Sequence, residues 1–304
     1  MTESRASSPV VVVTGANGFV GSHVCAALVD RGATVRAVVR RAGTAPEVPG
    51  VEEHVGAFGD AGFAAGVLAG ADAAVTTVHP MGSDRAARQQ VGVEDTSAFA
   101  RAARDAGVAL LVHVSTAAVY DRSPGVGDVD EASALVDDDA NDYAVTKRDT
   151  DLALAAIGEI TRVLVRPPAI LGSGESSVWN SLRPAEMRGD EEERRANPDQ
   201  TFAWVHVLDL AALIADVAAG RVQVSDDPEQ GPVEGACTPV NVAAGPATAR
   251  DYYGAVTRAL GVEPAWEDGP AWTGQILARR AQGWGWTPTT DLPAALAEVE
   301  EDLS

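Results

Sequence analysis

A glycine-punctuated turn near the N-terminus constrains the fold of this chain more than any other feature. The segment VVVTGANGFVGSHV places Gly15, Gly18 and Gly21 between an apolar, β-branched run and a helical pattern. Glycine permits backbone torsions and close approaches that a side chain would block, and a helix starting at such a turn offers unpaired N–H groups and partial positive charge to a pyrophosphate. The turn therefore predicts a strand, a phosphate-binding loop and a helix, with a dinucleotide as the ligand.

Predicted strands and helices alternate along the first half of the chain. Short apolar runs rich in β-branched residues predict six strands, at 9–13, 33–40, 53–57, 72–78, 109–115 and 160–167. Segments able to form helices separate them, including 93–107 and one that starts near Asn141. Such alternation implies an α/β fold with a doubly wound parallel sheet that helices cover on both faces.

The expected domain boundary follows the sixth predicted strand. Residues 9–171 are expected to form the dinucleotide-binding Rossmann domain, and residues 172–304 a small C-terminal substrate-binding lobe. Residues 172–200 contain glycine, serine and proline breaks and weak periodicity, and such irregular segments often build a substrate pocket. Two later segments, at about 202–219 and 239–244, are expected to return to the Rossmann core.

Composition narrows the classes of function. The net charge of −21 and the pI near 4.5 repel nucleic acid and anionic membranes, so neither is an expected partner. We interpret the acidity as a well-solvated surface, with adaptation to high salt as the alternative. Cys25 and Cys237 are too few for a disulfide framework, and no metal site is expected. The polar N-terminus and the lack of a membrane-length apolar run favour a cytoplasmic protein.

The end of the second predicted strand indicates which dinucleotide binds. Proteins that select NAD usually place an acidic residue there to accept the ribose hydroxyls, but this strand ends in Val39, Arg40 and Arg41. A guanidinium group can pair with the additional phosphate of NADP, although an ordinary surface arginine is the alternative. The prediction is NADP, with NAD possible.

A tyrosine and a lysine stand four residues apart in the segment NDYAVTKRDTDLAL. On a helix this spacing puts Tyr143 and Lys147 on one face, with Cβ atoms about 5–6 Å apart. A phenol has an ordinary pKa of about 10, so proton transfer near neutrality requires a stabilised phenolate, which a neighbouring ammonium supplies. Lys147 is also the only lysine in the chain. The pair is predicted to handle a proton, the alternative being a solvated, purely structural helix.

Two hydroxyl side chains, Ser115 and Thr116, lie at the carboxyl end of the predicted strand 109–115. Ligands of open α/β sheets bind at this end of the strands. A hydroxyl there can orient a carbonyl oxygen and stabilise its developing negative charge, and simple turn capping is the alternative role.

A family resemblance rests on motifs in a fixed order. The segments TGANGFVG, HVSTAAVY, YAVTK and RPPAILG are followed by FAWVHVLDLA and GWGWTP. Together they resemble, almost from end to end, the extended short-chain dehydrogenase/reductase family, also called the NAD-dependent epimerase/dehydratase family. The resemblance implies that Tyr143 is the acid/base, that Lys147 binds the nicotinamide ribose and lowers the tyrosine pKa, and that Thr116 is the hydroxyl partner. It also places Pro168 beside the nicotinamide and implies a homodimer.

The expected catalytic residues are therefore Thr116, Tyr143 and Lys147. The residues expected to contact the cofactor are Gly15, Asn17, Gly18, Phe19, Val20, Gly21, Arg40, Val78, Tyr143, Lys147 and Pro168.

Departures from the family pattern bear on the substrate. The acidic residue that contacts adenine in the family is Ala57 here, and the arginine that holds a sugar nucleotide's diphosphate is replaced by a stretch that begins at Phe202. An apolar residue cannot pair with diphosphate, so Phe202 and Trp204 suggest apolar pocket walls, with core packing an equal alternative. A basic pocket could still form from four later arginines, Arg183, Arg188, Arg194 and Arg195.

Three functions fit these residues. The first is an NADP(H)-dependent reductase of a ketone or aldehyde, or the reverse oxidation of an alcohol. The second is a nucleotide-sugar epimerase or dehydratase that retains bound NAD, and the third is a non-catalytic NADP sensor, which would not need the tyrosine–lysine pair. The substrate is expected to be a small molecule whose identity the sequence leaves open.

Overall fold

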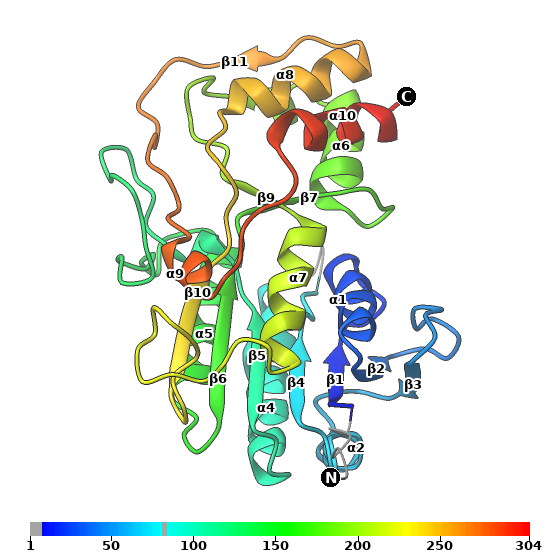
Figure 1. The fold of residues 1–304 in the computed structure, drawn as a ribbon. Helices are drawn as coiled ribbons and strands as arrows, with labels where there is room; N and C mark the ends of the chain where they lie inside the picture. The colour runs from blue at the N-terminus through cyan, green and yellow to red at the C-terminus, as the bar shows by residue number, and fades with distance from the viewer. Residues whose placement is uncertain (1–7, 81–83) are drawn as a thin grey trace. The chain divides into compact units, whose positions relative to one another are not determined.

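A seven-stranded sheet in the order β10-β6-β5-β4-β1-β2-β3 forms the centre of the fold (Figure 1). The computed structural model describes residues 8–80 and 84–304. The strands are β1 Val10–Thr14, β2 Thr34–Val39, β3 Val51–Val55, β4 Ala73–Thr76, β5 Leu110–Val114, β6 Thr161–Arg166 and β10 Cys237–Asn241. Strands β1 to β5 pair in parallel. The strand order reverses between β1 and β4, which is the position where open α/β sheets bind their ligands.

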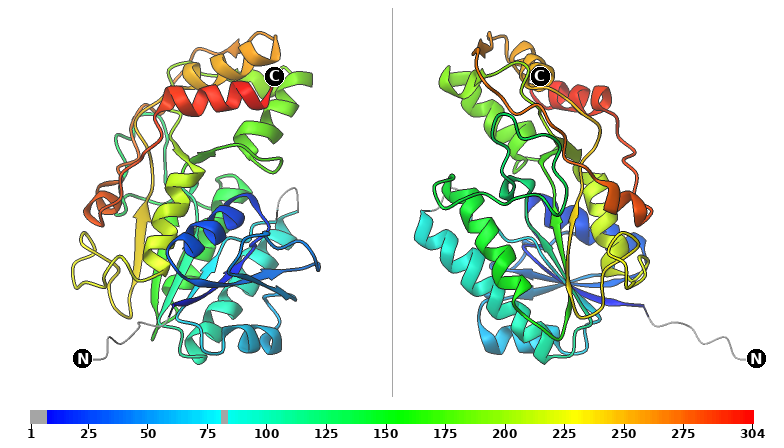
Figure 2. Two further views of the ribbon diagram at one scale, coloured as in Figure 1. Left: turned by 45° about the vertical axis from the view of Figure 1, so that its right-hand side comes forward. Right: turned by 90° about the vertical axis from the view of Figure 1, so that its left-hand side faces the viewer.

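Helices cover both faces of the sheet, as the doubly wound prediction requires (Figure 2). One face carries α1 (Phe19–Asp30) and α7 (Val207–Ala218), and the other carries α2 (Ala61–Leu68), α4 (Thr96–Asp105) and α5 (Asp142–Ala155). Arg31 at the end of α1 holds the first pair together, because its Nε lies 2.7 Å from the Asp216 carboxylate of α7. Within the described ranges, no helix combines the length and the apolar character needed to cross a bilayer.

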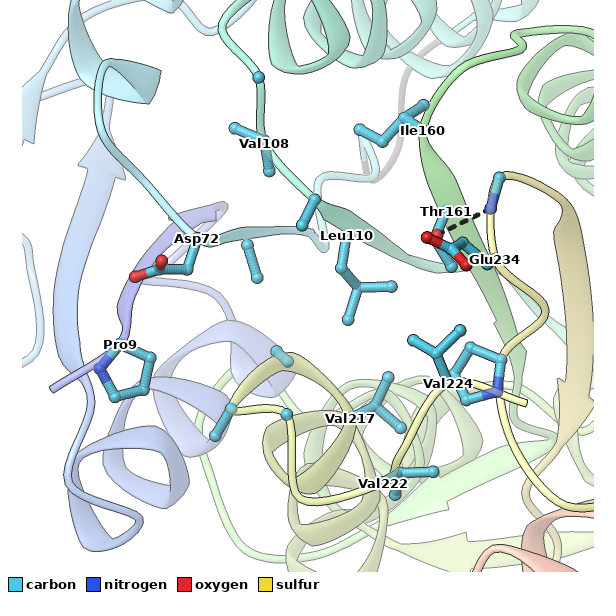
Figure 3. A pocket seen from close by; sticks show the side chains of 18 of the residues that line it. Pro9, Asp72, Val108, Leu110, Ile160, Thr161, Val217, Val222, Val224 and Glu234 are labelled. Carbon is cyan, nitrogen blue, oxygen red and sulfur yellow. Dashed lines mark hydrogen bonds between the residues drawn. The ribbon is translucent and has the colours of Figure 1, made fainter. Parts of the chain in front are cut away.

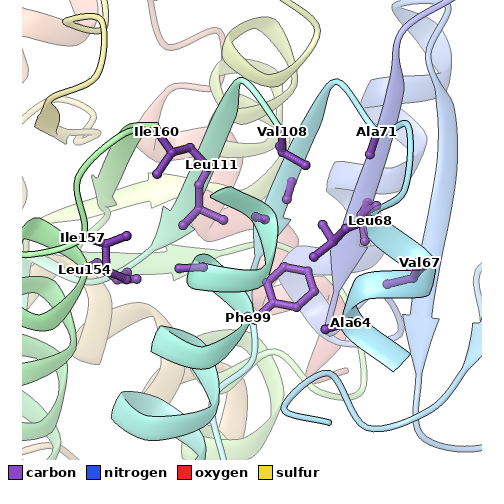
Figure 4. Packing of buried hydrophobic residues seen from close by; sticks show 14 of the residues in the cluster. Ala64, Val67, Leu68, Ala71, Phe99, Val108, Leu111, Leu154, Ile157 and Ile160 are labelled. Carbon is purple, nitrogen blue, oxygen red and sulfur yellow. The ribbon is translucent and has the colours of Figure 1, made fainter. Parts of the chain in front are cut away.

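An apolar core lies between the sheet and helices α2, α4 and α5 (Figure 4). Phe99 of α4 is fully buried at its centre, against Leu68 of α2 and Leu111 of β5. Leu154 of α5 and Leu164 of β6 extend the same cluster. Burying a side chain of this size contributes about 1.5–3 kcal/mol, so these residues fix where α5 lies on the sheet.

The chain folds into two compact units, each built from three separate stretches of the sequence. Among the described residues, the first comprises 8–80, 84–114, 146–164 and 211–238, and the second comprises 115–145, 165–210 and 239–304. The boundary expected at residues 171 and 172 lies inside the second unit. Two segments were expected to return to the Rossmann core. Of the first, 202–219, residues 211–219 lie in the first unit. The second, 239–244, begins within β10, which joins the central sheet.

The second unit has its own apolar core. Helices α6 (Arg183–Gly189), α8 (Ala249–Leu260) and α10 (Leu292–Asp302) contribute to it, and its buried residues include Met187, Trp204, Tyr252 and Val299. Short strands β7 (Ala169–Leu171) and β9 (Trp204–His206) pair in parallel, as do β8 (Arg195–Ala196) and β11 (Ala265–Trp266). A short helix α9 (Arg279–Gly283) precedes α10, and α3 (Arg85–Arg88) belongs to the first unit.

Several predicted boundaries shift in the structure. The third strand covers 51–55 rather than 53–57, because β3 is a half-exposed edge strand whose register follows its pairing with β2 rather than an apolar pattern. The helix expected at 93–107 starts as a π-helical segment at Gln89–Asp95 and continues as α4. The segment 172–200, expected to be irregular, contains a π-helical turn at Val178–Leu182 and α6.

The turn between β1 and α1 is built on two close approaches. Gly15 has a φ of +70°, a left-handed conformation that L side chains rarely adopt. Gly21, in the first turn of α1, lies so near the Gly15 carbonyl that a Cβ atom would stand 2.1 Å from its oxygen. Backbone atoms on both sides cannot yield as a flexible side chain could, so α1 packs on the turn only when residue 21 is glycine.

We therefore expect Gly21→Ala to destabilise the protein by about 1–3 kcal/mol, the usual cost of an overpacked site. Gly66→Ala is the matched control, because its Cβ would meet no atom within 4 Å and alanine in a helix gains about 0.5–1 kcal/mol over glycine. Urea unfolding of both variants measures the difference. Equal stability of Gly21→Ala and the wild type would show that the turn can relax.

Candidate active site

The glycine turn lies at the carboxyl ends of β1 and β4. A Cβ atom on Gly15 would stand 2.7 Å from Thr77 Oγ1 and 3.1 Å from Val78 Cγ2, so the loop backbone lies directly on the segment after β4. Gly18 is the N-cap of α1, and no side chain of the described residues caps it. Bare backbone at a helix N-terminus fits a pyrophosphate, so the first unit has the cradle that a dinucleotide requires.

The predicted cofactor contacts of the first unit surround this turn. Phe19, Val20 and Gly21 form the first turn of α1, and Val78 is placed beside Gly15. Asn17 Nδ2 donates to Thr44 Oγ1 at 3.4 Å, which links the turn to the loop after β2.

The loop after β2 carries the two arginines considered for the NADP phosphate. Arg40 and Arg41 are exposed and line a small cavity of about 380 Å³. Glu53 of β3 holds the loop, because its carboxylate accepts hydrogen bonds at 2.9–3.0 Å from the N–H groups of Gly43, Thr44 and Ala45. These bonds lower the pKa of Glu53. The sequence analysis missed this anchor, for which the signal was an acidic residue on the neighbouring strand.

Helix α5 brings Tyr143 and Lys147 onto successive turns, as the spacing predicted. Asn141 caps the helix, with its Oδ1 accepting from the Ala144 N–H at 3.0 Å. The Lys147 side chain is buried, and its Nζ donates to the Val114 carbonyl at 3.0 Å. Burial lowers the pKa of Lys147 to about 8, although the nearby Asp151 carboxylate raises it.

Two histidines of the first unit respond to the Lys147 charge. Burial, together with the positive charges of Lys147 and Arg88, lowers the pKa of His79 to about 3. His113 on β5 is fully buried, and burial and Lys147 lower its pKa as well. Its Nδ1 lies 2.7 Å from the Thr76 hydroxyl. Both imidazoles are therefore neutral at physiological pH, and Lys147 is the cation among these three groups.

Thr116 and Tyr143 meet within the second unit. Their hydroxyl groups form a hydrogen bond that lowers the pKa of Tyr143, and the positive charge of Arg122 acts in the same direction. Burial is the larger effect and raises the pKa of Tyr143 above its ordinary value. The expected lowering of this pKa is therefore not what the structure shows, because the desolvation of the ring outweighs its polar neighbours. Thr116 also caps a turn by accepting from the Ala118 N–H at 3.1 Å, which is the alternative role considered from the sequence.

Tyr143 and Thr116 line a cavity of about 340 Å³ in the second unit. Pro168 is also in its wall, whereas Ser115 is not. The aromatic and basic residues in the wall of this cavity are Trp179, Phe202, Tyr253, Arg122 and Arg195. Phe202 both lines the cavity and stacks on Tyr252 at 4.4 Å between ring centroids, while Trp204 is core only. Sequence reasoning missed Arg122, Trp179 and Tyr253.

The four-arginine basic pocket considered from the sequence does not form. Of the four, Arg195 alone lines the cavity, and it is neutralised by Glu192 at 2.7 Å and Glu267 at 2.9 Å. Arg183 pairs with Glu193 at 3.2 Å. These carboxylates neutralise the positive charge that a diphosphate would need. The sequence pattern did not connect them with the arginines, because the contacts form only in the fold.

A larger cavity, of about 830 Å³, lies at the opposite ends of the strands in the first unit (Figure 3). Leu110 starts β5 and Thr161 starts β6, so the cavity is at their amino ends. Its walls are mainly apolar, with Val108, Val217 and Val224 prominent. Ligands of this class of sheet bind at the carboxyl ends of the strands, so cavity size does not identify the candidate site here.

Comparison with known proteins agrees with this geometry. Residues 11–226 match the model of the NAD dependent epimerase/dehydratase family. A 4-hydroxy-2-methyl-3-oxo-4-farnesyl-3,4-dihydroquinoline-1-oxide ketoreductase of Stigmatella aurantiaca is 33% identical over 179 residues, which are 56% of this chain and 53% of the relative. Ceramide reductase of Caulobacter vibrioides is 32% identical over 225 residues, 71% of this chain and 64% of the relative.

The fold is similarly matched by solved structures. A short-chain dehydrogenase/reductase superfamily protein from Agrobacterium tumefaciens, crystallised with bound NAD, superposes with a TM-score of 0.75 at 22% identity, and the match covers 96% of each chain. The present chain spans between about a half and two thirds of the length of the two curated relatives. The family match over most of the chain decides the assignment: the protein belongs to the NAD dependent epimerase/dehydratase family.

Proposed function

We propose that this enzyme reduces a ketone or aldehyde with NADPH, or runs the reverse oxidation. The observation that carries the proposal is the hydrogen bond between the hydroxyl groups of Tyr143 and Thr116 at the wall of a cavity. The buried ammonium of Lys147 stands one helical turn further along α5. A positioned acid and a second hydroxyl are the groups that a carbonyl oxygen needs as it gains negative charge.

The residues divide the reaction between them. NADPH, when bound, supplies the hydride that the carbonyl carbon receives. Thr116 donates a hydrogen bond to the carbonyl oxygen and orients it. Tyr143 gives its phenolic proton to that oxygen, so that the C=O bond becomes C–OH and a phenolate remains. Burial keeps the Tyr143 phenol protonated until this step, and the Thr116 hydrogen bond and the Arg122 charge favour the phenolate that forms.

The cofactor side of the proposal rests on the first unit. Gly15, Gly18 and Gly21 would hold the pyrophosphate, and Lys147 the nicotinamide ribose. Arg40 and Arg41 stand at the end of β2, where an NAD-selective protein has an acidic residue, and Glu53 fixes the loop that follows them. A guanidinium pair on an anchored loop supports NADP over NAD.

The reductase fits the cavity better than a nucleotide-sugar epimerase or dehydratase does. A cavity of about 340 Å³ is at the small end of the range for ligand sites. Phe202 stands in its wall, and Arg195 there is already neutralised by two glutamates. These features favour a compact, partly apolar carbonyl compound over a nucleotide diphosphate.

Replacing Tyr143 with phenylalanine tests the acid. We expect Tyr143→Phe to lower kcat by roughly 10²–10⁴-fold, the usual contribution of a positioned acid, while cofactor affinity stays within a few-fold. Tyr253→Phe is the matched control, because it keeps an aromatic ring in the cavity wall and loses only a hydroxyl that accepts from Arg183. Steady-state kinetics and a fluorescence titration of NADPH measure both quantities. A Tyr143→Phe enzyme with unchanged turnover would remove the phenol from the mechanism.

Replacing Arg40 with alanine tests cofactor choice. Loss of a charged hydrogen bond to the extra phosphate should weaken NADPH binding by about 10–100-fold, equivalent to roughly 1.5–3 kcal/mol, and leave NADH binding nearly unchanged. Arg101→Ala, on the exposed surface of α4, controls for the change in net charge. Titration of both nucleotides decides: a parallel loss for NADPH and NADH would place Arg40 elsewhere than at the phosphate.

The pH dependence follows from the pKa of Lys147, which is about 8. Below that pH the ammonium is charged and Tyr143 is protonated, so kcat/KM for reduction should be flat. Above it the ammonium loses its proton, and the rate should fall as the pH rises. Lys147→Arg keeps the charge to much higher pH, so any activity that it retains should show no decline near pH 8. An identical decline in both proteins would assign the ionisation to another group.

A further inference from the structure

The arginines near the cavity of the second unit differ in how their charges are balanced. Arg195 pairs with two glutamates, and Arg183 pairs with Glu193 and lies over the Trp179 ring. Arg122 is the exception. No carboxylate in residues 8–80 or 84–304 forms an ion pair with its guanidinium, although Arg122 lines the cavity.

The turn that carries Arg122 is firmly held. Tyr120 pairs with Leu135 across a β-bridge, and its hydroxyl donates to Asn241 Oδ1 at 2.8 Å. Arg166 donates to the same hydroxyl at 2.8 Å. The neighbouring carboxylate of Asp121 is engaged by Ser123, whose N–H and hydroxyl both donate to it. The residues on both sides of Arg122 are therefore held by hydrogen bonds.

The guanidinium of Arg122 lies against an aromatic ring and next to the acid. Its Cζ atom is 5.5 Å from the centroid of Trp272, whose indole N–H is fixed by the Gly127 carbonyl at 2.9 Å. Burial lowers the pKa of Arg122, and Arg122 in turn affects the pKa of Tyr143. A partly desolvated cation without a counter-ion is costly unless a ligand supplies the opposite charge.

We propose that Arg122 binds a carboxylate group of the substrate, so that the carbonyl compound reduced at Tyr143 is an oxo acid. This inference rests on the proposed reductase function, because Tyr143 in the same cavity marks the position of the reacting carbonyl. A guanidinium presents a planar fork that matches one carboxylate in a bidentate manner. One unbalanced charge and a cavity of about 340 Å³ fit a single carboxylate rather than a diphosphate.

The rest of the cavity wall indicates the body of the acid. Trp179, Phe202 and Tyr253 contribute aromatic surface, Ala118, Ala169 and Ala249 contribute small apolar surface, and Gln200 and Thr201 add polar groups. The aromatic and apolar part of this wall suits an aryl or short alkyl group. The inferred substrate class is therefore an aryl- or alkyl-substituted oxo acid.

The test compares each acid with its neutral ester. The probes are phenyl-substituted oxo acids whose carboxylate lies two, three or four carbons from the ketone, each with its methyl ester. Binding is measured without dinucleotide, by quenching of the tryptophan fluorescence, so that no turnover is needed. We expect at least one acid to bind about 10–100-fold more tightly than its ester, as a charge-assisted bidentate bond implies.

Variants locate that preference. Arg122→Met should remove it, Arg122→Lys should restore part of it, and Arg195→Met should keep it, because that guanidinium is already paired. A wild-type protein that binds acids and esters equally, or a preference that survives Arg122→Met, would overturn the inference.

Turnover separates this inference from the proposed function. With NADPH added, reduction of the preferred acid would support both. Binding of acids through Arg122 with no consumption of NADPH by any probe would sink the reductase proposal and leave the anion site. Efficient reduction of esters with no preference for acids would support the reductase proposal and overturn the inference about Arg122.

Discussion

The burial of one positive charge organises the chemistry of helix α5. The Lys147 ammonium is buried and donates a hydrogen bond to the Val114 carbonyl. The nearby Asp151 carboxylate attracts it and raises its pKa. Desolvation outweighs that attraction and brings the pKa to about 8. Burial, helped by the same charge, lowers the pKa values of His79 and His113 and keeps both imidazoles neutral. An arginine could not hold this position in the same way, because its bulky fork stays charged and needs several acceptors, which explains why an arginine-rich chain has lysine here.

The parts of the molecule that follow from local pattern could be predicted from the sequence. The turn at Gly15 and Gly21 and the placing of Tyr143 and Lys147 on successive turns of α5 depend on residues close together in the sequence, and the doubly wound sheet follows from the alternation of strand and helix patterns. Such signals are strong because strand alternation and helical spacing are fixed by backbone geometry. The edge strand β3 was misplaced by two residues because a half-exposed strand has no apolar period to mark it.

The cavity walls could not be predicted, because they depend on contacts between distant segments. Arg122, Trp179 and Tyr253 share a cavity although more than fifty residues separate each from the next. The pKa of Tyr143 was misjudged for a related reason. Spacing along the helix shows which charged residue is near the phenol. Burial raises the pKa of Tyr143, and the depth of that burial depends on the packing of the whole second unit.

An acidic protein can still select an anion if the selection works at contact range. The field of a net charge of −21 opposes the approach of an acid, but salt screens it over roughly 8 Å. Inside the lobe the balance is local: Glu192 and Glu267 neutralise Arg195, whereas Arg122 rests on Trp272 without a carboxylate partner among the described residues. A partly buried charge is screened much less than a surface one. Long-range charge therefore slows the encounter, and the short-range charge of Arg122 decides which molecule stays.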